Sequence, residues 1–446
     1  MRKLTALLGV LLTGLVVFCQ DDAAKLDELV GAYAKQYKFN GSVLVAKGGK
    51  VILEKGYGYR NAKDSLLNDG QTIFQIGSIT KQFTATVILK LQEQKKLSVK
   101  DKLSKYYPDF PKGDSITIEH LLTHTSGIFN YTNDGKFMSM DAIKPANEEK
   151  ILALFKSKPL DFSPGTKWSY SNSGYSLLGY IIQKVTKKPY EQVVREFIFH
   201  PLQMIHSGFD FTHLTDKNRA TGYFTYSEKV KAPSTIVDSS VAFSAGAIYT
   251  TVEDLYKWHK GMQQNKIINA ASTKSAYTPF LNNYGYGLGI DSMYGKRIIA
   301  HGGGIFGFNT NIARIVEDDI CIVLLNNTGN PFLGEINNNI LAELYGKPYE
   351  LPMEKKVVKV DPAKLTAYVG EYELAPTFII TVTLENDELK AQPTGQPKFD
   401  LSATSDTTFF VKAVDADLSF VKDASGKVEK LILKQGGKET AGKKIK

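Results

Sequence analysis

The sequence is poor in cysteine and has no long apolar run after its first residues. Its 446 residues include only two cysteines, Cys19 and Cys321. If Cys19 leaves with an export signal, no intramolecular disulfide can form, and stability has to come from the core. Cys321 stands in the run ICIVLL, which predicts a buried core residue rather than a nucleophile. No later run of 18 apolar residues occurs, so we expect no membrane span after signal removal.

The first residues are typical of an export signal. Arg2 and Lys3 precede an apolar stretch that is too short to cross a bilayer comfortably. We therefore predict a signal peptide over residues 1–19 and a periplasmic or secreted protein. A lipid anchor on Cys19 is the alternative, but the bulky Phe18 stands where such processing sites need a small residue.

Clear signals for nucleic acid, dinucleotide or metal binding are also missing. The net charge is +9, but the lysines are spread along the chain and not clustered with aromatics, so we expect no nucleic acid and at most attraction to an anionic envelope surface. The run GGGIFG is followed by a β-like segment, whereas a dinucleotide fingerprint opens a helix. His120 and His124 have metal-pair spacing but no accompanying glutamate or cysteine cluster. We therefore predict no metal and no cofactor. Sequons at Asn130 and Asn326 are frequent by chance.

The order of predicted elements indicates an α/β fold. Residues 42–59 form a predicted hairpin, residues 78–95 a helix whose segment TATVILKL is apolar nearly all round, and residues 297–326 three further strands. The region between is mostly helical, with proline and glycine breaks. This order predicts an antiparallel sheet flanked by helices, with a mostly helical subdomain.

The composition changes after Gly346, which indicates a second domain. We predict a main domain over residues 20–346, a Pro- and Lys-rich linker over 347–362, and a small all-β meander or barrel over 363–446. Asn386-Asp387 is one of its predicted turns.

The motif G-x-S-x-G is absent, but the tetrad S-x-x-K occurs at Ser78-Ile-Thr-Lys81. Positions i and i+3 share a helix face, so Lys81 can reach Ser78. Burial and the helix N-terminus both lower the pKa of such a lysine towards that of a usable base. A second copy, Ser419 to Lys422, lies in a predicted strand, where i and i+3 point to opposite faces, and we attribute it to chance.

Two further motifs lie downstream. Tyr170-Ser171-Asn172 follows a Pro-Gly turn and leads into an apolar helix, which places the phenol on a positioned loop. We expect a nearby lysine ammonium to lower the pKa of Tyr170, so that it relays protons. His301-Gly302-Gly303-Gly304 follows a strand, and its glycines let a substrate backbone approach the strand edge.

These three motifs, in this order, resemble those of the penicillin-binding and class C β-lactamase-like serine hydrolases. Matching stretches include FQIGSITKQFTA, IEHLLTHTSGI and PGTKWSYSNSGYSLLG, and the resemblance covers about residues 25–345. It implies that Ser78 forms the acyl-enzyme and that Lys81 and Tyr170 share the acid and base work. The C-terminal segment is similar to the lipocalin-like barrels appended to some of these enzymes.

The resemblance also implies the substrate contacts. Asn172 would bind the substrate amide or acyl chain, and the backbone N–H groups of Ser78 and Gly304 would form the oxyanion hole. His301, Gly302 and Gly303 stand where β-lactamases usually carry Lys-Thr-Gly, and members with histidine there tend to be peptidases or esterases.

The histidine at position 301 shapes the functional hypothesis. Histidine is mostly neutral at pH 7 and so is a weaker partner for a substrate carboxylate than lysine. We therefore expect a D-residue-specific peptidase or carboxypeptidase, or an esterase, with weak or no β-lactamase activity. Its substrate would be a small peptide or ester. The alternative is a non-catalytic envelope protein that binds cell-wall peptide.

Overall fold

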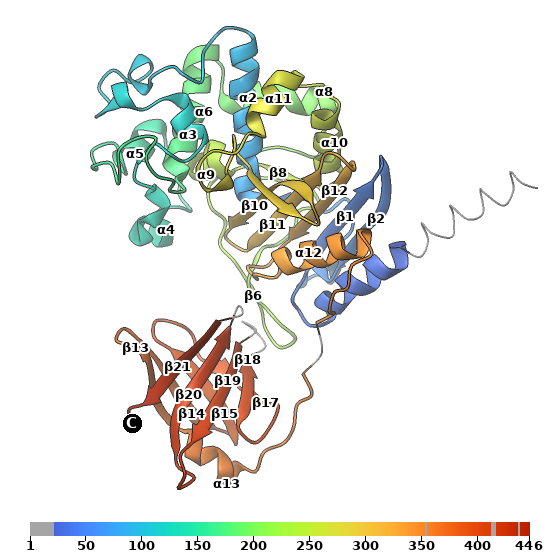
Figure 1. The fold of residues 1–446 in the computed structure, drawn as a ribbon, viewed down its shortest axis with the longest axis vertical. Helices are drawn as coiled ribbons and strands as arrows, with labels where there is room; N and C mark the ends of the chain where they lie inside the picture. Colours follow the sequence, from blue (N-terminus) through green and yellow to red (C-terminus); the bar gives the residue numbers. More distant parts are fainter. Residues whose placement is uncertain (1–21, 353–354, 412–415, 436–437) are drawn as a thin grey trace, which may run out of the picture. The chain divides into compact units, whose positions relative to one another are not determined.

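The structure is a computed structural model that describes residues 22–352, 355–411, 416–435 and 438–446. The chain divides into two compact units, one ending at Leu351 and the other beginning at Pro352, and each is described here by itself (Figure 1). The predicted signal peptide, residues 1–19, lies outside the described residues. In the described ranges no helix is long and apolar enough to cross a membrane.

The first unit is built on a six-stranded sheet in the order β2-β1-β12-β11-β10-β9. Every neighbouring pair is antiparallel, and the N-terminal hairpin lies beside β12, which follows about 260 residues later in the chain. This confirms the predicted antiparallel sheet. The strands are β1 (Gly41–Lys47), β2 (Lys50–Tyr57), β9 (Gly289–Met293), β10 (Lys296–Ile305), β11 (Phe308–Ile315) and β12 (Ile320–Asn326).

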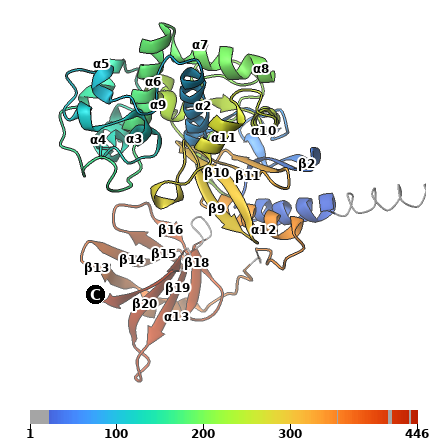
Figure 2. The same ribbon diagram turned by 45° about the horizontal axis from the view of Figure 1, so that its top comes forward.

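Helices cover both faces of this sheet, as Figure 2 shows. In β12, Cys321, Val323 and Leu325 pack into the core shared with α2 (Thr80–Glu93) and α10 (Val252–Gln263). The alternate residues of β12 pack on the other face with α12 (Leu333–Leu344) and a helix over residues 22–35. A strand that is buried on both faces has an unbroken apolar sequence, as the run ICIVLL in β12 does. Cys321 is fully buried, as predicted.

The segment between β2 and β9 is mostly helical, as expected. Its central helices, α2, α6 (Asn172–Thr186) and α9 (Ser239–Gly246), pack on one another. The others are α3 (Ile118–Leu122), α4 (Gly135–Met140), α5 (Glu148–Ala153), α7 (Tyr190–Val194), α8 (His200–Leu202) and α11 (Ala270–Ala276). Short strand pairs join β3 (Tyr59–Asn61) to β4 (Leu66–Leu67), β5 (Phe74–Gln75) to β8 (Tyr249–Thr250) and β6 (Tyr223–Tyr226) to β7 (Lys231–Pro233).

The second unit is a nine-stranded, nearly closed barrel in the order β16-β15-β14-β13-β21-β20-β19-β18-β17. Its edge strands β16 and β17 are separated in the chain by Leu401 alone, so the sheet curls until its edges almost meet. Tyr368, Tyr372 and Phe420 lie in its core. The strands are β13 (Gly370–Ala375), β14 (Phe378–Glu385), β15 (Glu388–Pro393), β16 (Phe399–Asp400), β17 (Ser402–Ala403), β18 (Thr408–Val411), β19 (Ala416–Lys422), β20 (Val428–Gln435) and β21 (Lys438–Lys444).

Local details of the second unit agree with its sequence. Asn386 and Asp387 both have positive φ, as a two-residue hairpin turn requires. Ser419 and Lys422 lie in β19, which supports treating that S-x-x-K as chance. Val358, inside the predicted linker, donates its N–H to Ala403 O at 2.9 Å, so part of this segment packs on the barrel.

A close backbone contact joins β10 to the turn η1 (Gly77–Ile79), which directly precedes α2. A Cβ at Gly303 would lie 1.9 Å from Ile76 O, so only glycine allows this approach. Thr310 on β11 reinforces it by donating its hydroxyl to Ile76 O at 2.9 Å. The predicted helix 78–95 therefore begins as a 3-10 turn, and its position is set by the edge of the sheet.

We predict that Gly303→Ala destabilises the first unit, whereas Gly302→Ala does not. The added methyl group at Gly303 would collide with Ile76 O, and overpacking of this kind costs about 1–3 kcal/mol. At Gly302 the nearest atom to an added Cβ is 3.7 Å away. Both tryptophans of the chain, Trp168 and Trp258, lie in this unit, so tryptophan fluorescence during denaturant unfolding reports on it alone. Equal midpoints for the two variants would contradict the prediction.

Candidate active site

Ser78 lies in η1, and Lys81 lies one turn later, at the start of α2. Lys81 Nζ is 3.0 Å from Ser78 Oγ, which confirms that the tetrad brings the two side chains together. Lys81 is fully buried and Ser78 is partly exposed. The hydroxyl is therefore open to a substrate while the amine behind it is shielded from water.

Two further acceptors surround the Lys81 amine. It donates to Asn172 Oδ1 on α6 and to the Ala245 carbonyl on α9, both at 2.7 Å. Burial holds the pKa of Lys81 well below its usual value, which makes loss of its proton easier. A neutral amine has two N–H groups and one lone pair. The protonated amine donates its third N–H to Ser78 Oγ, whereas in the neutral amine the lone pair faces the Ser78 hydroxyl.

Tyr170 completes the contact shell of Ser78. Its hydroxyl donates to Ser78 Oγ at 2.7 Å, and its ring centroid is 4.9 Å from Lys81 Nζ. Burial raises the pKa of Tyr170 above its ordinary value, so the expected lowering is wrong. The reason is that burial of the Tyr170 hydroxyl disfavours the charged phenolate more than the hydrogen bond to Ser78 favours it. Tyr170 is therefore a neutral hydrogen-bond donor to Ser78.

Asn172 is fixed at the start of α6 by a loop that passes beside it. Its backbone N–H donates to Asn130 Oδ1, and its Nδ2 donates to Thr132 Oγ1, both at 3.0 Å. Its Oδ1 therefore faces Lys81 in a single amide orientation. Asn130 is buried, and so is Asn326, which donates to Thr328 within its own tripeptide. Neither sequon is an accessible acceptor for a glycan.

His301 lies on β10 and is neutral. Burial lowers its pKa to about 4, and the nearby Lys81 adds to this effect. Its Nδ1–H donates to Gly302 O at 2.5 Å, so its Nε2 accepts the Tyr284 hydroxyl hydrogen at 2.8 Å. Both ring nitrogens are thus occupied within the protein. His301 offers a substrate carboxylate neither a positive charge nor a free N–H.

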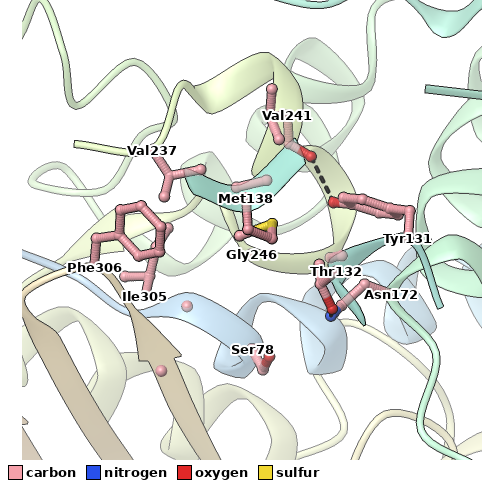
Figure 3. Close-up of a pocket in the computed structure, with 14 residues that line it drawn as sticks. Ser78, Tyr131, Thr132, Met138, Asn172, Val237, Val241, Gly246, Ile305 and Phe306 are labelled. Carbon is pink, nitrogen blue, oxygen red and sulfur yellow. Dashed lines mark hydrogen bonds between the residues drawn. The ribbon is translucent and has the colours of Figure 1, made fainter. Parts of the chain in front are cut away.

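A cavity of about 320 Å³ opens in front of Ser78 (Figure 3). Its polar side chains are those of Ser78, Thr132, Asn172 and Tyr131. The Tyr131 hydroxyl is already hydrogen-bonded, because it donates to the Val241 carbonyl at 2.8 Å. None of the lining side chains is charged. The apolar wall consists of Met138, Val237, Val241, Ala242, Ala245, Ile305 and Phe306.

The predicted glycines occupy different positions around this cavity. Gly304 lines it together with Ser78, and its backbone lies about 3 Å from where a Cβ of Gly77 would be. The assignment of the Ser78 and Gly304 N–H groups to an oxyanion hole stays a prediction. Gly303 faces Ile76, and Gly302 is exposed on the other side of β10. Gly302 and Gly303 are not among the residues that line the cavity.

Several contacts of the site were missing from the sequence analysis. The Ala245 carbonyl contacts Lys81 and the Tyr284 hydroxyl contacts His301. Both residues lie in stretches that resemble the family, SAGAIYTTVEDLYKW and YGYGLGI, but neither had been assigned a role in the site. Asn130 and Thr132 were noticed only as a sequon. No group of three His, Cys, Asp or Glu residues that could hold a metal occurs in the described part of the chain. His120 instead accepts the Thr117 backbone N–H at 3.2 Å and closes the start of α3.

Comparisons with known proteins agree with this geometry. The Beta-lactamase family pattern matches residues 26–346, and the pattern described as "Domain of unknown function (DUF3471)" matches residues 354–444. A penicillin-binding protein of Bacillus subtilis (strain 168) is 29% identical, over 95% of this chain and 99% of its own. PbpX of the same strain is 34% identical, over 70% of this chain and 77% of its own.

Solved structures share the fold. The octameric penicillin-binding protein homologue from Pyrococcus abyssi superposes with a TM-score of 0.66 at 27% identity, covering 94% of this chain and 99% of that one. D-amino acid amidase from Ochrobactrum anthropi superposes with a TM-score of 0.62 at 24% identity, covering 72% and 99%. The chain therefore belongs to the β-lactamase family and is a serine hydrolase related to the penicillin-binding proteins.

Proposed function

We propose that the protein hydrolyses a small ester or amide through an acyl-enzyme on Ser78. The observation that carries this proposal is the 3.0 Å contact between Ser78 Oγ and a buried Lys81 amine whose other contacts use up its N–H groups. The Ser78 oxygen bonds to the substrate carbonyl carbon while its proton passes to the Lys81 lone pair. The bond from that carbon to the leaving group then breaks, and the leaving group takes up a proton.

Tyr170 is placed to relay that proton. Its hydroxyl touches Ser78 Oγ and keeps its own hydrogen because burial raises its pKa. It can pass a hydrogen to the departing group while receiving one from the Lys81 side. Water then attacks the acyl carbon, and the same groups act in reverse.

We infer that the substrate group next to Ser78 is uncharged and apolar. The cavity has an apolar wall and no charged side chain, and His301 is neutral with both nitrogens occupied. A free substrate carboxylate would have to give up its water without gaining an ionic partner. Esters, and amides or D-residue peptides whose reacting end is uncharged, suit this site better than carboxypeptidase substrates or β-lactams.

We propose further that the protein works outside the cytoplasm, as its predicted signal peptide indicates. The similarity to penicillin-binding proteins supports a role in the cell envelope. Cell-wall peptide is then one candidate source of its substrate.

We expect Ser78→Ala to abolish turnover and Lys81→Met to reduce it at least about a hundredfold, because general base catalysis contributes about 10²–10⁴-fold. The purified mature protein would be assayed on a short-chain aryl ester, a D-residue amide, a D-Ala-D-Ala peptide and a cephalosporin. Turnover is expected to be highest for the ester or the amide. Activity that persists in Ser78→Ala would refute the mechanism, and no turnover of any substrate would favour a binding protein.

The neutral state of His301 predicts a flat pH dependence of substrate choice. A histidine whose pKa is lowered to about 4 from 6.5 stays uncharged as pH falls from about 8 to about 5. We therefore expect a constant ratio of kcat/KM between an ester with a neutral acyl chain and its counterpart ending in a carboxylate. Titration of enzyme groups that act on both substrates affects the two kcat/KM values equally and does not change their ratio. A rise in relative use of the carboxylate between about pH 7 and about pH 6, where the carboxyl group of the substrate is still ionised, would show that His301 becomes charged.

A further inference from the structure

His124 lies directly behind Tyr170 and has no role in the chemistry described so far. It follows α3, is 1% exposed, and has a φ of +59°, in the left-handed region that few residues other than glycine adopt. Its ring centroid is 4.3 Å from that of Tyr170. A buried histidine in an unfavourable backbone conformation needs a physical reason.

His124 holds the chain on both sides of Tyr170. The Ser169 N–H donates to the His124 backbone carbonyl at 2.9 Å, and the Ser171 N–H donates to His124 Nδ1 at 3.1 Å. The residues immediately before and after Tyr170 are therefore both tied to His124. With the ring contact in addition, one residue restrains the phenol in three ways.

The ring performs this task only in its neutral form. Because Nδ1 accepts a hydrogen bond, the ring hydrogen is on Nε2, and burial keeps the pKa of His124 well below its usual value. Nε2 has no hydrogen-bond partner in the described part of the chain. The ring centroids of Tyr175 and Tyr284 lie 5.1 Å and 4.8 Å from the centroid of the His124 ring. An unpartnered buried N–H costs about 1–3 kcal/mol. A histidine kept only for packing would be replaced by a phenylalanine or leucine without that cost.

We propose that His124 is a positioning residue for the acyl transfer, which holds the Tyr170 hydroxyl against Ser78 through the Ser171 N–H. This inference rests on the proposed function, because it assigns Tyr170 a part in proton transfer. This positioning role differs from that of a metal ligand and from that of a residue that only fills the core. It also explains why Ser171 stands between two residues of the site: its N–H is the point of attachment.

The test compares His124→Asn with His124→Gly. Both residues tolerate a positive φ and both remove the ring, but the Asn Oδ1 can take the place of Nδ1 as acceptor for the Ser171 N–H. We expect His124→Gly to lower kcat about ten- to a hundredfold with KM changed less than about threefold, since small misplacements of a catalytic group cost this much. We expect His124→Asn to stay within about fivefold of the wild type.

A double-mutant cycle with Tyr170→Phe identifies the residue through which His124 acts. If His124 acts through Tyr170, adding His124→Gly to Tyr170→Phe lowers kcat by less than about threefold further. Losses that multiply in full would show a general effect on the fold and overturn the proposal. Tryptophan fluorescence during unfolding checks that each variant is folded. If His124→Gly is not folded, His124→Asn alone carries the test, because it tolerates the positive φ, and a folded His124→Asn with kcat lowered about tenfold or more would overturn the proposal.

The controls separate this inference from the proposed function. Wild-type enzyme without turnover above the Ser78→Ala blank would mean that the proposed function has failed. Active wild type with an equally active, folded His124→Gly would mean that the positioning role alone has failed. A folded His124→Asn that is as impaired as His124→Gly would also overturn the role of the Nδ1 acceptor.

Discussion

The burial of the Lys81 amine is the interaction on which the rest of the site depends. A charged ammonium without a carboxylate is costly inside a protein, and the cost is avoided when the amine is neutral. The contacts of Lys81 come from the turn before α2, from α6 and from α9, so the packing of these three segments fixes the direction of its lone pair. The packing of these helices thus directs the Lys81 amine at Ser78.

The sheet forms the other wall of the site, and close packing fixes its position too. β10 approaches η1 so closely that a side chain at position 303 would collide with the Ile76 carbonyl. This approach brings Gly304 next to Ser78 and places the buried His301 near Tyr170. Burial in the same packed region lowers the pKa of His301 to about 4, so His301 stays neutral beside the buried Lys81.

Features that depend on local pattern could be predicted from the sequence. The strands of the sheet, the helix that begins near Ser78 and the all-β second unit follow from periodicity and turn residues. The pairing of Ser78 with Lys81 follows from helical spacing. The pKa of Tyr170 was predicted in the wrong direction, because it depends on burial produced by distant segments.

Other contacts were beyond sequence reasoning because they join residues far apart in the chain. Ala245 is 164 residues from Lys81, and its contribution is a backbone carbonyl, which any residue type would provide. Tyr284 opens YGYGLGI, a stretch that resembles the family, but nothing in that stretch indicates that its hydroxyl contacts His301. The apolar cavity is likewise assembled from α4, α9 and the end of β10, so its character appears only after folding.

The neutrality of the cavity and the neutrality of the base are physically linked. An opposite charge nearby favours the charged form of a lysine, so a substrate carboxylate bound beside Lys81 would raise its pKa and occupy the lone pair with a proton. A lysine in place of His301, as in the Lys-Thr-Gly motif of β-lactamases, would pair with that carboxylate and repel a proton from Lys81. His301 can do neither, because it is uncharged and its nitrogens are already hydrogen-bonded. Under the proposed mechanism, therefore, an uncharged substrate is the one that leaves Lys81 able to act as the base.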